Sequence, residues 1–183
     1  MALKSTIFKA ELQISDLDRH YYQTHALTLA RHASETDERM MVRLAAFALN
    51  ADETLAFGAG LSTDDQADLW RHDLTGAITL WIDVGLPDVK LVRRAAGRAA
   101  QVIVYTYGRG ADVWWTQNRA ELNRSANLAV YKLPPETTQA LAAMAARNMR
   151  LQCMIQDGEA SMTDEANSVV IAVQTMKKPG RSN

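Results

Sequence analysis

The segment from Asp68 to Gly85 constrains the fold more than any other part of the sequence, because it predicts a β-hairpin with a defined register. Apolar and polar residues alternate on both sides of Thr75-Gly76, a dipeptide typical of a turn. With that turn, antiparallel pairing sets Trp70 opposite Trp81 and Asp68 opposite Asp83.

The pairing also sorts the side chains of this hairpin onto two faces, since successive residues of a strand point to opposite sides. One face carries acidic, aromatic and polar residues: Asp68, Trp70, His72, Thr79, Trp81 and Asp83. The other face carries aliphatic residues: Leu69, Ile78, Leu80 and Ile82. Asp73, the other acid of the hairpin, falls beside the turn and on the face opposite to Asp68.

Asp68 and Asp83 are the candidate metal ligands. Carboxylates directly opposite each other, with Cβ atoms about 5 Å apart, repel unless a cation neutralises them. Two carboxylates, with water and substrate phosphate completing the shell, describe a Mg²⁺ site of the phosphodiester-cleaving kind. A second interpretation stays open, in which Asp68 belongs to an exposed acidic loop with Asp64 and Asp65 and Asp83 caps the following helix.

Strands and helices interleave along the rest of the chain. Patterning and composition predict strands over 6–14, 25–31, 55–61, 101–107, 127–133, 149–156 and 169–175. Helices are predicted after an N-cap at Ser34, from Pro87 to about 97–100, over 112–122 and over 134–147. The strand–helix–strand order around 77–107 predicts a parallel crossover. The fold class is therefore α+β, with a mixed β-sheet and flanking helices.

Length and composition exclude several classes of protein. A chain of 183 residues predicts one domain, and 20 basic against 21 acidic residues exclude a strongly basic DNA-coating protein. Charged residues interrupt the first fifteen positions, and no apolar run reaches membrane-spanning length. A single cysteine, Cys153, permits no internal disulfide. We expect a cytoplasmic monomer that has no membrane association.

Four stretches of the chain resemble the YaeQ family of bacterial proteins. They are Ser34-Glu35-Thr36-Asp37-Glu38-Arg39-Met40, Asp68-Leu69-Trp70, Leu80-Trp81-Ile82-Asp83-Val84-Gly85-Leu86-Pro87-Asp88 and Trp114-Trp115. The resemblance covers nearly the whole chain, 1–183, as one domain. It implies a variant of the restriction-endonuclease-like PD-(D/E)XK core over about 35–107, in which a helix, a three-stranded meander, a helix and a further strand carry the site.

The resemblance places the two halves of the nuclease motif on this chain. The first half falls on Ala67-Asp68, with alanine in place of proline, and the second on Asp83-Val84-Gly85. Gly85 stands where the motif has a lysine, which would stabilise the attacking water and the charge on phosphorus. A cation from the following helix could replace it, and we expect Lys90 to do so, with Arg93 and Arg94 as substrate-binding residues or as part of a solvated face.

The start of the first long helix supplies further candidates. In the superfamily this helix packs near the two aspartates, which makes Glu35 a candidate catalytic residue and Glu38 a candidate metal ligand. Acids in a first helical turn are also favoured by the helix dipole alone. Arg39 and Arg43 lie one turn apart on a line with Glu35, where they could neutralise that carboxylate or bind a substrate phosphate.

These residues predict a Mg²⁺- or Mn²⁺-dependent phosphodiesterase or nuclease. The near-neutral charge favours weak or transient binding of nucleic acid, because affinity for long duplexes grows with the number of phosphates neutralised. Trp114 and Trp115 could stack bases, but without a basic patch they are more typical of a core. The alternative is a non-catalytic protein that keeps the nuclease fold and binds a protein partner in transcription or repair, which the missing lysine favours.

Overall fold

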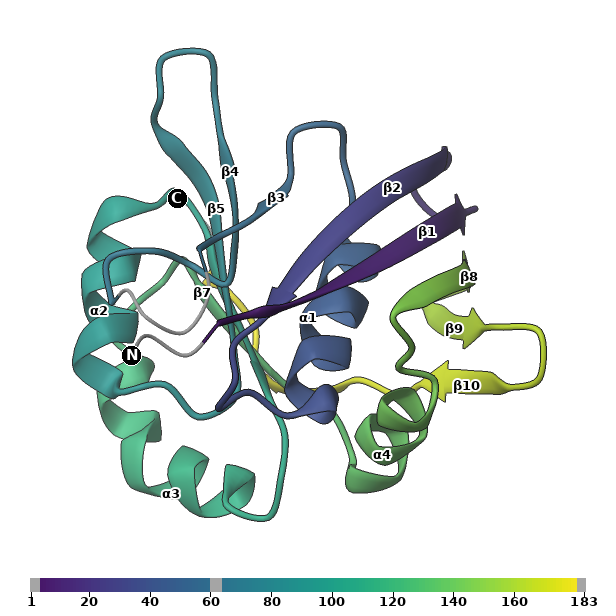
Figure 1. Cartoon of the computed structure of the whole chain (residues 1–183). Coiled ribbons are helices and arrows are strands. Elements are labelled where there is room, and N and C mark those ends of the chain that lie inside the picture. The colour runs from purple at the N-terminus through teal and green to yellow at the C-terminus, as the bar shows by residue number, and fades with distance from the viewer. Residues whose placement is uncertain (1–3, 60–63, 181–183) are drawn as a thin grey trace.

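The structure, a computed structural model, describes residues 4–59 and 64–180, which form two β-sheets and four helices (Figure 1). The five-stranded sheet has the order β10-β9-β8-β1-β2. Its strands are β1 (Thr6–Asp16), β2 (Tyr21–Arg31), β8 (Asn148–Gln156), β9 (Glu159–Thr163) and β10 (Ser168–Ile171). The six-stranded sheet has the order β11-β7-β6-β5-β4-β3. Its strands are β3 (Ala56–Phe57), β4 (Leu69–His72), β5 (Ile78–Val84), β6 (Val102–Thr106), β7 (Leu128–Lys132) and β11 (Gln174–Lys177).

Helix α1 (Asp37–Asn50) lies between the two sheets (Figure 1). Residues 40–48 of this helix are all buried, and Arg43 is the one charged residue among them. Their apolar side chains share one core with the inward residues of β1 and β8 and with the aliphatic face of β4 and β5. A helix that is buried on every side has a nearly continuous run of apolar residues, and residues 40–48 of α1 form such a run.

The opposite face of the six-stranded sheet is covered by α2 (Val89–Arg98) and α3 (Ala111–Leu122). These helices connect β5 to β6 and β6 to β7, and both strand pairs are parallel. The predicted crossover is therefore confirmed. Trp114 and Trp115 are half-buried in this second core, as expected for packing residues. The fourth helix, α4 (Pro135–Ala143), contacts α1.

The predicted register of the β4–β5 hairpin is confirmed for most of its length. Leu69 pairs with Ile82, Trp70 with Trp81 and Arg71 with Leu80. A bulge follows Arg71, so that His72 pairs with Ile78, and Ile78 packs with the core of Trp81 instead of with Leu80. A bulge inserts one residue and reverses the alternation beyond it, which explains this departure from the expected face.

Several predicted boundaries were wrong, each for a local reason. The N-cap of α1 is Thr36, whose hydroxyl accepts a hydrogen bond from the Arg39 amide at 3.1 Å, while the Ser34 hydroxyl contacts the His32 ring. Asp88 caps α2, so Pro87 lies before the helix and is not its first residue. In both cases the residue that directly precedes the helix has a side-chain acceptor, and this residue is the N-cap.

Other elements are shorter, longer or divided. Strand β2 begins at Tyr21, four residues before the expected start, and α4 ends at Ala143, not at 147. The strand expected over 55–61 is reduced to β3, and its last two residues fall outside the described ranges. The strand expected over 169–175 is two strands in different sheets, β10 and β11. Over the described residues, no helix is both long and apolar enough to cross a bilayer.

Candidate functional site

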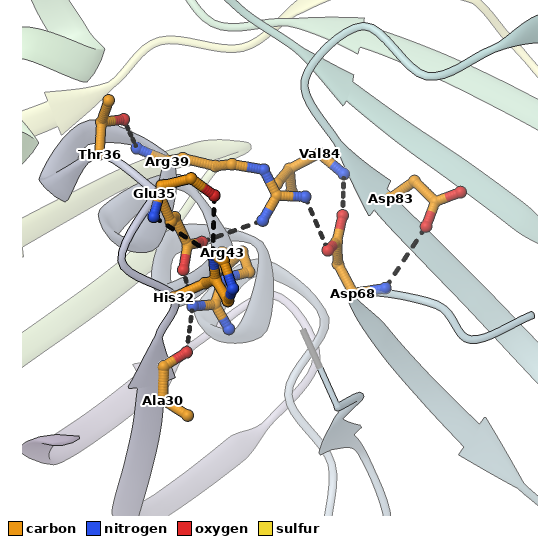
Figure 2. Close-up of polar contacts among 10 residues, drawn as sticks. Ala30, His32, Glu35, Thr36, Arg39, Arg43, Asp68, Asp83 and Val84 are labelled. Atoms are coloured by element: carbon orange, nitrogen blue, oxygen red, sulfur yellow. Dashed lines mark hydrogen bonds and ion pairs between the residues drawn. The ribbon is translucent and has the colours of Figure 1, made fainter. Parts of the chain in front are cut away.

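Asp68 and Asp83 lie side by side where β4 begins and β5 ends (Figure 2). The Val84 amide donates to Asp68 Oδ2 at 2.8 Å, and the Asp68 amide lies 3.4 Å from Asp83 Oδ1. These contacts follow from the hairpin register, which places the end of one strand against the start of the other. The predicted juxtaposition of the two carboxylates is therefore present in the fold.

The environment of Asp83 disfavours its negative charge. Burial and the neighbouring Asp68 carboxylate raise its pKa to about 6, although the Trp81 indole donates to Asp83 Oδ2 at 2.9 Å. Loss of solvation and repulsion between like charges both stabilise the protonated form of a carboxyl group. A cation bound between the two aspartates would relieve this repulsion.

Arg39 joins Asp68 to the start of α1. Its Nη2 donates to Asp68 Oδ1 at 2.8 Å and its Nη1 donates to Glu35 Oε1 at 2.9 Å (Figure 2). The side chain is 16% exposed, so these charge-assisted hydrogen bonds are largely shielded from water. Arg39 thus supplies one positive charge beside the carboxylate pair and fixes the orientation of Asp68.

Glu35 is anchored in the interior by two arginines. Arg43 donates to Glu35 through Nε and Nη2, each at 2.8 Å, and to the Ala30 carbonyl at 3.1 Å. The Glu35 and Arg43 side chains are 1% and 2% exposed. Because three N–H groups occupy the Glu35 carboxylate, its place in the fold is to hold Arg39 and not to face the aspartates directly.

Glu38 points to another part of the molecule. The Thr138 hydroxyl of α4 donates to Glu38 Oε1 at 2.6 Å. Glu38 does not line the pocket that contains Asp68 and Asp83. Neither acid of this segment is therefore brought together with the carboxylate pair as the resemblance implied, and both have structural partners instead.

The carboxylate pair lines a pocket of about 380 Å³ at the carboxyl ends of the parallel strands β5 and β6. Polar residues line one part of it: Arg39, Asp64, Gln66, Asp68 and Asp83. Mostly apolar and aromatic residues line the rest: Trp81, Val84, Gly85, Leu86, Pro87, Leu91 and Tyr107. Open α/β sheets bind ligands at this edge, so the location alone favours a site.

Tyr107 is a pocket residue that the sequence analysis missed. It directly follows β6, and burial raises the pKa of its hydroxyl. The signal that could have found it is its position just after a predicted parallel strand next to β5. Side chains at the carboxyl ends of neighbouring parallel strands converge on one edge.

The three predicted cations of α2 lie outside this pocket. Lys90 is exposed in the first turn of the helix. Arg93 pairs with Glu121 at 2.6 Å and Arg94 with Asp65 at 3.4 Å, and both arginines are more than half exposed. Exposed pairs of this kind contribute little to stability and leave each side chain free to move.

At two positions of the site, Gly85 and Gly58, the backbone conformation or its close packing requires a glycine. Gly85 has a φ of +99°, a left-handed conformation that disfavours any residue with a Cβ, so the position is poorly suited to the motif lysine. Gly58 donates from its amide to the Asp68 carbonyl at 2.9 Å. A Cβ at Gly58 would lie 1.9 Å from the Ala67 carbonyl oxygen. Only glycine, which has no Cβ, therefore allows the chain just after β3 to donate this hydrogen bond to Asp68.

The donor set of the pocket fits one hard divalent cation. Each oxygen of Asp68 and Asp83 accepts one hydrogen bond, from Arg39, Val84, Asp68 or Trp81. Carboxylate oxygens have further lone pairs, so all four can still coordinate. The described residues contain no cluster of three or more acidic, histidine or cysteine ligands. Two carboxylates with water and substrate oxygens are the arrangement that Mg²⁺ usually takes.

Comparison with known proteins gives matches along nearly the whole chain. The family described as "YaeQ protein" matches residues 1–173. "Uncharacterized protein YaeQ" of Escherichia coli (strain K12) is 44% identical over 181 residues, which is 98% of this chain and 99% of the relative. The relative of the same name from Salmonella typhi is 43% identical over 98% of this chain and 99% of its own length.

Two crystal structures have the same fold. The YaeQ protein of Xanthomonas axonopodis pv. citri superposes with a TM-score of 0.91 at 49% identity, covering 96% of this chain and 99% of that one. The YaeQ protein of Pseudomonas syringae also gives a TM-score of 0.91, at 34% identity, covering 95% of this chain and 97% of that one. The arrangement of two sheets around α1 is therefore shared with experimentally determined structures.

Proposed function

The chain belongs to the YaeQ family, and from that premise we propose that it is a Mg²⁺- or Mn²⁺-dependent phosphodiesterase acting on nucleic acid. The observation that carries the proposal is the Asp68–Asp83 pair in a pocket, with the pKa of Asp83 raised to about 6 by burial and by Asp68. Perturbed carboxylates that share a pocket are typical of functional sites.

The order of elements supports the nuclease-like part of this proposal. Helix α1, the strands β3, β4 and β5, helix α2 and strand β6 follow one another along the chain. This is the helix, meander, helix and strand layout expected of the PD-(D/E)XK core. Asp68 and Asp83 occupy the two acidic positions of that motif.

A bound divalent cation would polarise a phosphate oxygen and lower the pKa of a coordinated water. Asp68 and Asp83 would hold it, and the Val84 amide and Arg39 fix Asp68 for that purpose. Arg39 uses two of its five N–H donors on carboxylates, which leaves donors for a phosphate oxygen. Trp81 orients Asp83 through its indole N–H.

The proposal includes a second cation near the substrate. Lys90 lies in the first turn of α2 and could extend toward a phosphate bound at the mouth of the pocket, as Arg93 and Arg94 could from the next turn. The Lys90→Ala variant should lower turnover while leaving Mn²⁺ affinity unchanged. An undiminished rate would remove Lys90 from the mechanism and leave Arg39 as the candidate cation.

The decisive test is calorimetric titration of Mg²⁺ and Mn²⁺ into the wild type and into Asp68→Asn/Asp83→Asn. Glu159→Gln/Glu165→Gln is the matched control, since it removes two exposed acids of the five-stranded sheet region. We expect binding in the wild type and the control and none in the aspartate variant. Hydrolysis of single-stranded, duplex and branched DNA would then be measured under the same conditions.

A second function is favoured by Gly85 and by the lack of cations lining the described pocket other than Arg39. A protein with this fold could bind a protein partner without catalysis. Absence of metal binding, both alone and with thymidine 3′,5′-bisphosphate present, would favour this alternative. Pull-down experiments with the wild type and Asp68→Asn/Asp83→Asn would then be the appropriate next measurement.

A further inference from the structure

We infer that the pocket binds one nucleotide-sized phosphodiester unit at the end of a single strand, and that it does not bind a continuous duplex. This inference rests on the proposed function, because it names the substrate class of the same site. It is carried by the size of the pocket, by its mixed polar and apolar lining and by the distribution of charge around it.

The size of the pocket suits a small ligand. A volume of about 380 Å³ lies in the range of small-molecule sites, near its lower end. A duplex instead requires an extended surface that contacts phosphates over many base pairs. A pocket of this size admits one nucleotide with its phosphate, which requires an unstacked base such as the terminal base of a strand.

The polar part of the pocket lining offers one anchored contact for a phosphate. Among the residues that the structure describes, Arg39 is the cationic side chain that lines the pocket. Glu35 and Asp68 hold it from two directions, at 2.9 Å and 2.8 Å. An anchored guanidinium loses little side-chain freedom on binding an anion, which makes it suited to a single phosphate group.

The apolar residues of the pocket lining suit the flat face of a base. They include Leu86, Pro87 and Leu91, and Tyr107 adds an aromatic ring. Leu86 is 41% exposed, although the loop that carries it is held by the hydrogen bond from the Trp114 indole to the Pro87 carbonyl. An exposed leucine on a loop held by this hydrogen bond, in a pocket that also contains a tyrosine ring, offers a surface on which a base can pack.

Three arginines of α2, which lie outside the pocket, already contact other groups of the protein. Arg93 and Arg94 pair with Glu121 and Asp65, and the Arg98 guanidinium lies over the Trp81 ring, 5.3 Å from its centroid. The whole chain has a net charge of −1. Since affinity for duplex DNA grows with each phosphate neutralised, this surface favours a ligand with few phosphate contacts.

The test compares three ligands by fluorescence anisotropy in Ca²⁺, with each ligand checked for integrity afterwards. They are labelled dinucleotide dTdT, a single-stranded oligothymidylate and a duplex of the same length. We expect the dinucleotide and the oligothymidylate to bind within about threefold of each other and the duplex at least tenfold more weakly. The logarithm of the association constant, plotted against the logarithm of the salt concentration, should have a slope of about −1, as for contacts with one or two phosphates.

Two variants test whether this binding depends on the apolar and aromatic residues of the lining. Leu86→Ser and Tyr107→Phe change side chains of the pocket without creating a buried charge, and Leu86 is 41% exposed. Leu86→Ser should weaken dinucleotide binding about fivefold or more, and Tyr107→Phe should weaken it less because the ring remains. Leu74→Ser, at the fully exposed tip of the β4–β5 hairpin, is the control and should bind as the wild type.

The outcomes separate this inference from the proposed function. Tighter binding of the duplex with a steep salt dependence, no binding of any ligand, or no effect of Leu86→Ser would overturn the inference. The calorimetric Mn²⁺ titration would still support or exclude the metal site in each case. Dinucleotide binding that depends on Leu86 but occurs in a protein without a metal site would support the inference and exclude the phosphodiesterase.

Discussion

The Asp68 carboxylate accepts a 2.8 Å hydrogen bond from the amide of Val84, the residue that follows Asp83. The two aspartates are therefore linked through the main chain of β5 and not only through the positions of their side chains. A main-chain donor has few ways to move, so the separation of the two carboxylates is set by the sheet itself. The carboxylate pair is therefore held rigidly, and the repulsion between the two carboxylates has an energetic cost that can be measured.

Ionisation of Asp83 should destabilise the metal-free protein. Its pKa of about 6 in the fold lies above the value of 3.8 for a free side chain, so the folded state binds its proton more tightly than the unfolded state does. Stability therefore falls as pH rises from about 4 to about 6 and stays lower above that, by on the order of 2 to 3 kcal/mol. Urea denaturation of the wild type and Asp83→Asn over this range should show the variant gaining relative stability with pH. A difference that does not change with pH would contradict the shifted pKa.

Asp83→Asn should stabilise the metal-free fold, whereas removal of a bound metal from the wild type should destabilise it. A cation that binds the aspartate pair stabilises the fold by mass action, by about 2.7 kcal/mol at a concentration of 100 times Kd. For a chain of this length we expect Tm to rise by about 5 to 10 °C with Mn²⁺ and to return with EDTA. Differential scanning calorimetry of Asp68→Asn/Asp83→Asn provides the comparison. An equal rise in that variant would locate the bound metal elsewhere.

Loss of Glu35 should be among the most destabilising single changes in the chain. Glu35→Ala leaves the Arg43 guanidinium, which is 2% exposed, with the Ala30 carbonyl as its remaining hydrogen-bond partner in the described structure. Removing one member of a buried ion pair costs about 3 to 5 kcal/mol. Glu38→Ala is the control, since it removes one hydrogen bond to Thr138 and should cost about 1 kcal/mol. If urea denaturation gave the same loss of unfolding free energy for Glu35→Ala and Glu38→Ala, the buried Glu35–Arg43 pair would contribute no more to stability than the Glu38–Thr138 hydrogen bond.

Arg39 should have opposite effects on metal binding and on turnover. Arg39→Gln removes a positive charge that lies 2.8 Å from Asp68, so the affinity for Mn²⁺ should increase, by about tenfold. If Arg39 contacts the substrate phosphate, kcat should fall by about 10²-fold, as for loss of one charge-stabilising donor. Arg124→Gln, an exposed arginine beyond α3, should change neither quantity. Weaker metal binding in Arg39→Gln would indicate that Arg39 mainly positions Asp68.

Gly85 and Gly97 form a matched pair for testing backbone strain. Gly85→Ala places a Cβ at a φ of +99° and should destabilise the fold by about 1 to 2 kcal/mol, although the space around it is open. Gly97→Ala lies inside α2, also in open space, and should stabilise it by about 0.5 to 1 kcal/mol. Thermal denaturation of both variants would show whether each substitution lowers or raises the stability of the fold. Gly85→Lys should be destabilised like Gly85→Ala, which would explain why the motif lysine is not found there.

Local patterns predicted the hairpin well because its register depends on neighbouring residues. Alternation around a turn sufficed to pair Trp70 with Trp81 and to bring Asp68 beside Asp83. The bulge after Arg71 was not predictable in the same way. At the bulge the Thr79 hydroxyl donates to the Arg71 carbonyl at 3.1 Å, and alternation of apolar and polar residues does not encode where such an irregularity falls.

The contacts around the site were harder to predict because they join distant segments. The family resemblance made Glu35 a candidate catalytic residue. Arg39 and Arg43 lie on the same helical line as Glu35, and the structure has both arginines neutralising its carboxylate, which is the other role considered for them in the sequence. Tyr107 reaches the pocket only through the pairing of β5 with β6. The partner of Glu38, Thr138, lies 100 positions further along the chain, beyond the reach of any local pattern.

Because α1 packs against both sheets, the segment of about 35–107 shares its core with strands that lie outside it. Isolated from the rest, it would expose the side of α1 that meets Leu12 and Ile14 of β1 and Leu151 of β8. The helix that supplies Arg39 to the pocket is thus held in place from behind by strands from both ends of the chain. Assembly of the carboxylate site should coincide with the global folding transition, so its metal affinity would report the integrity of the most distant strands.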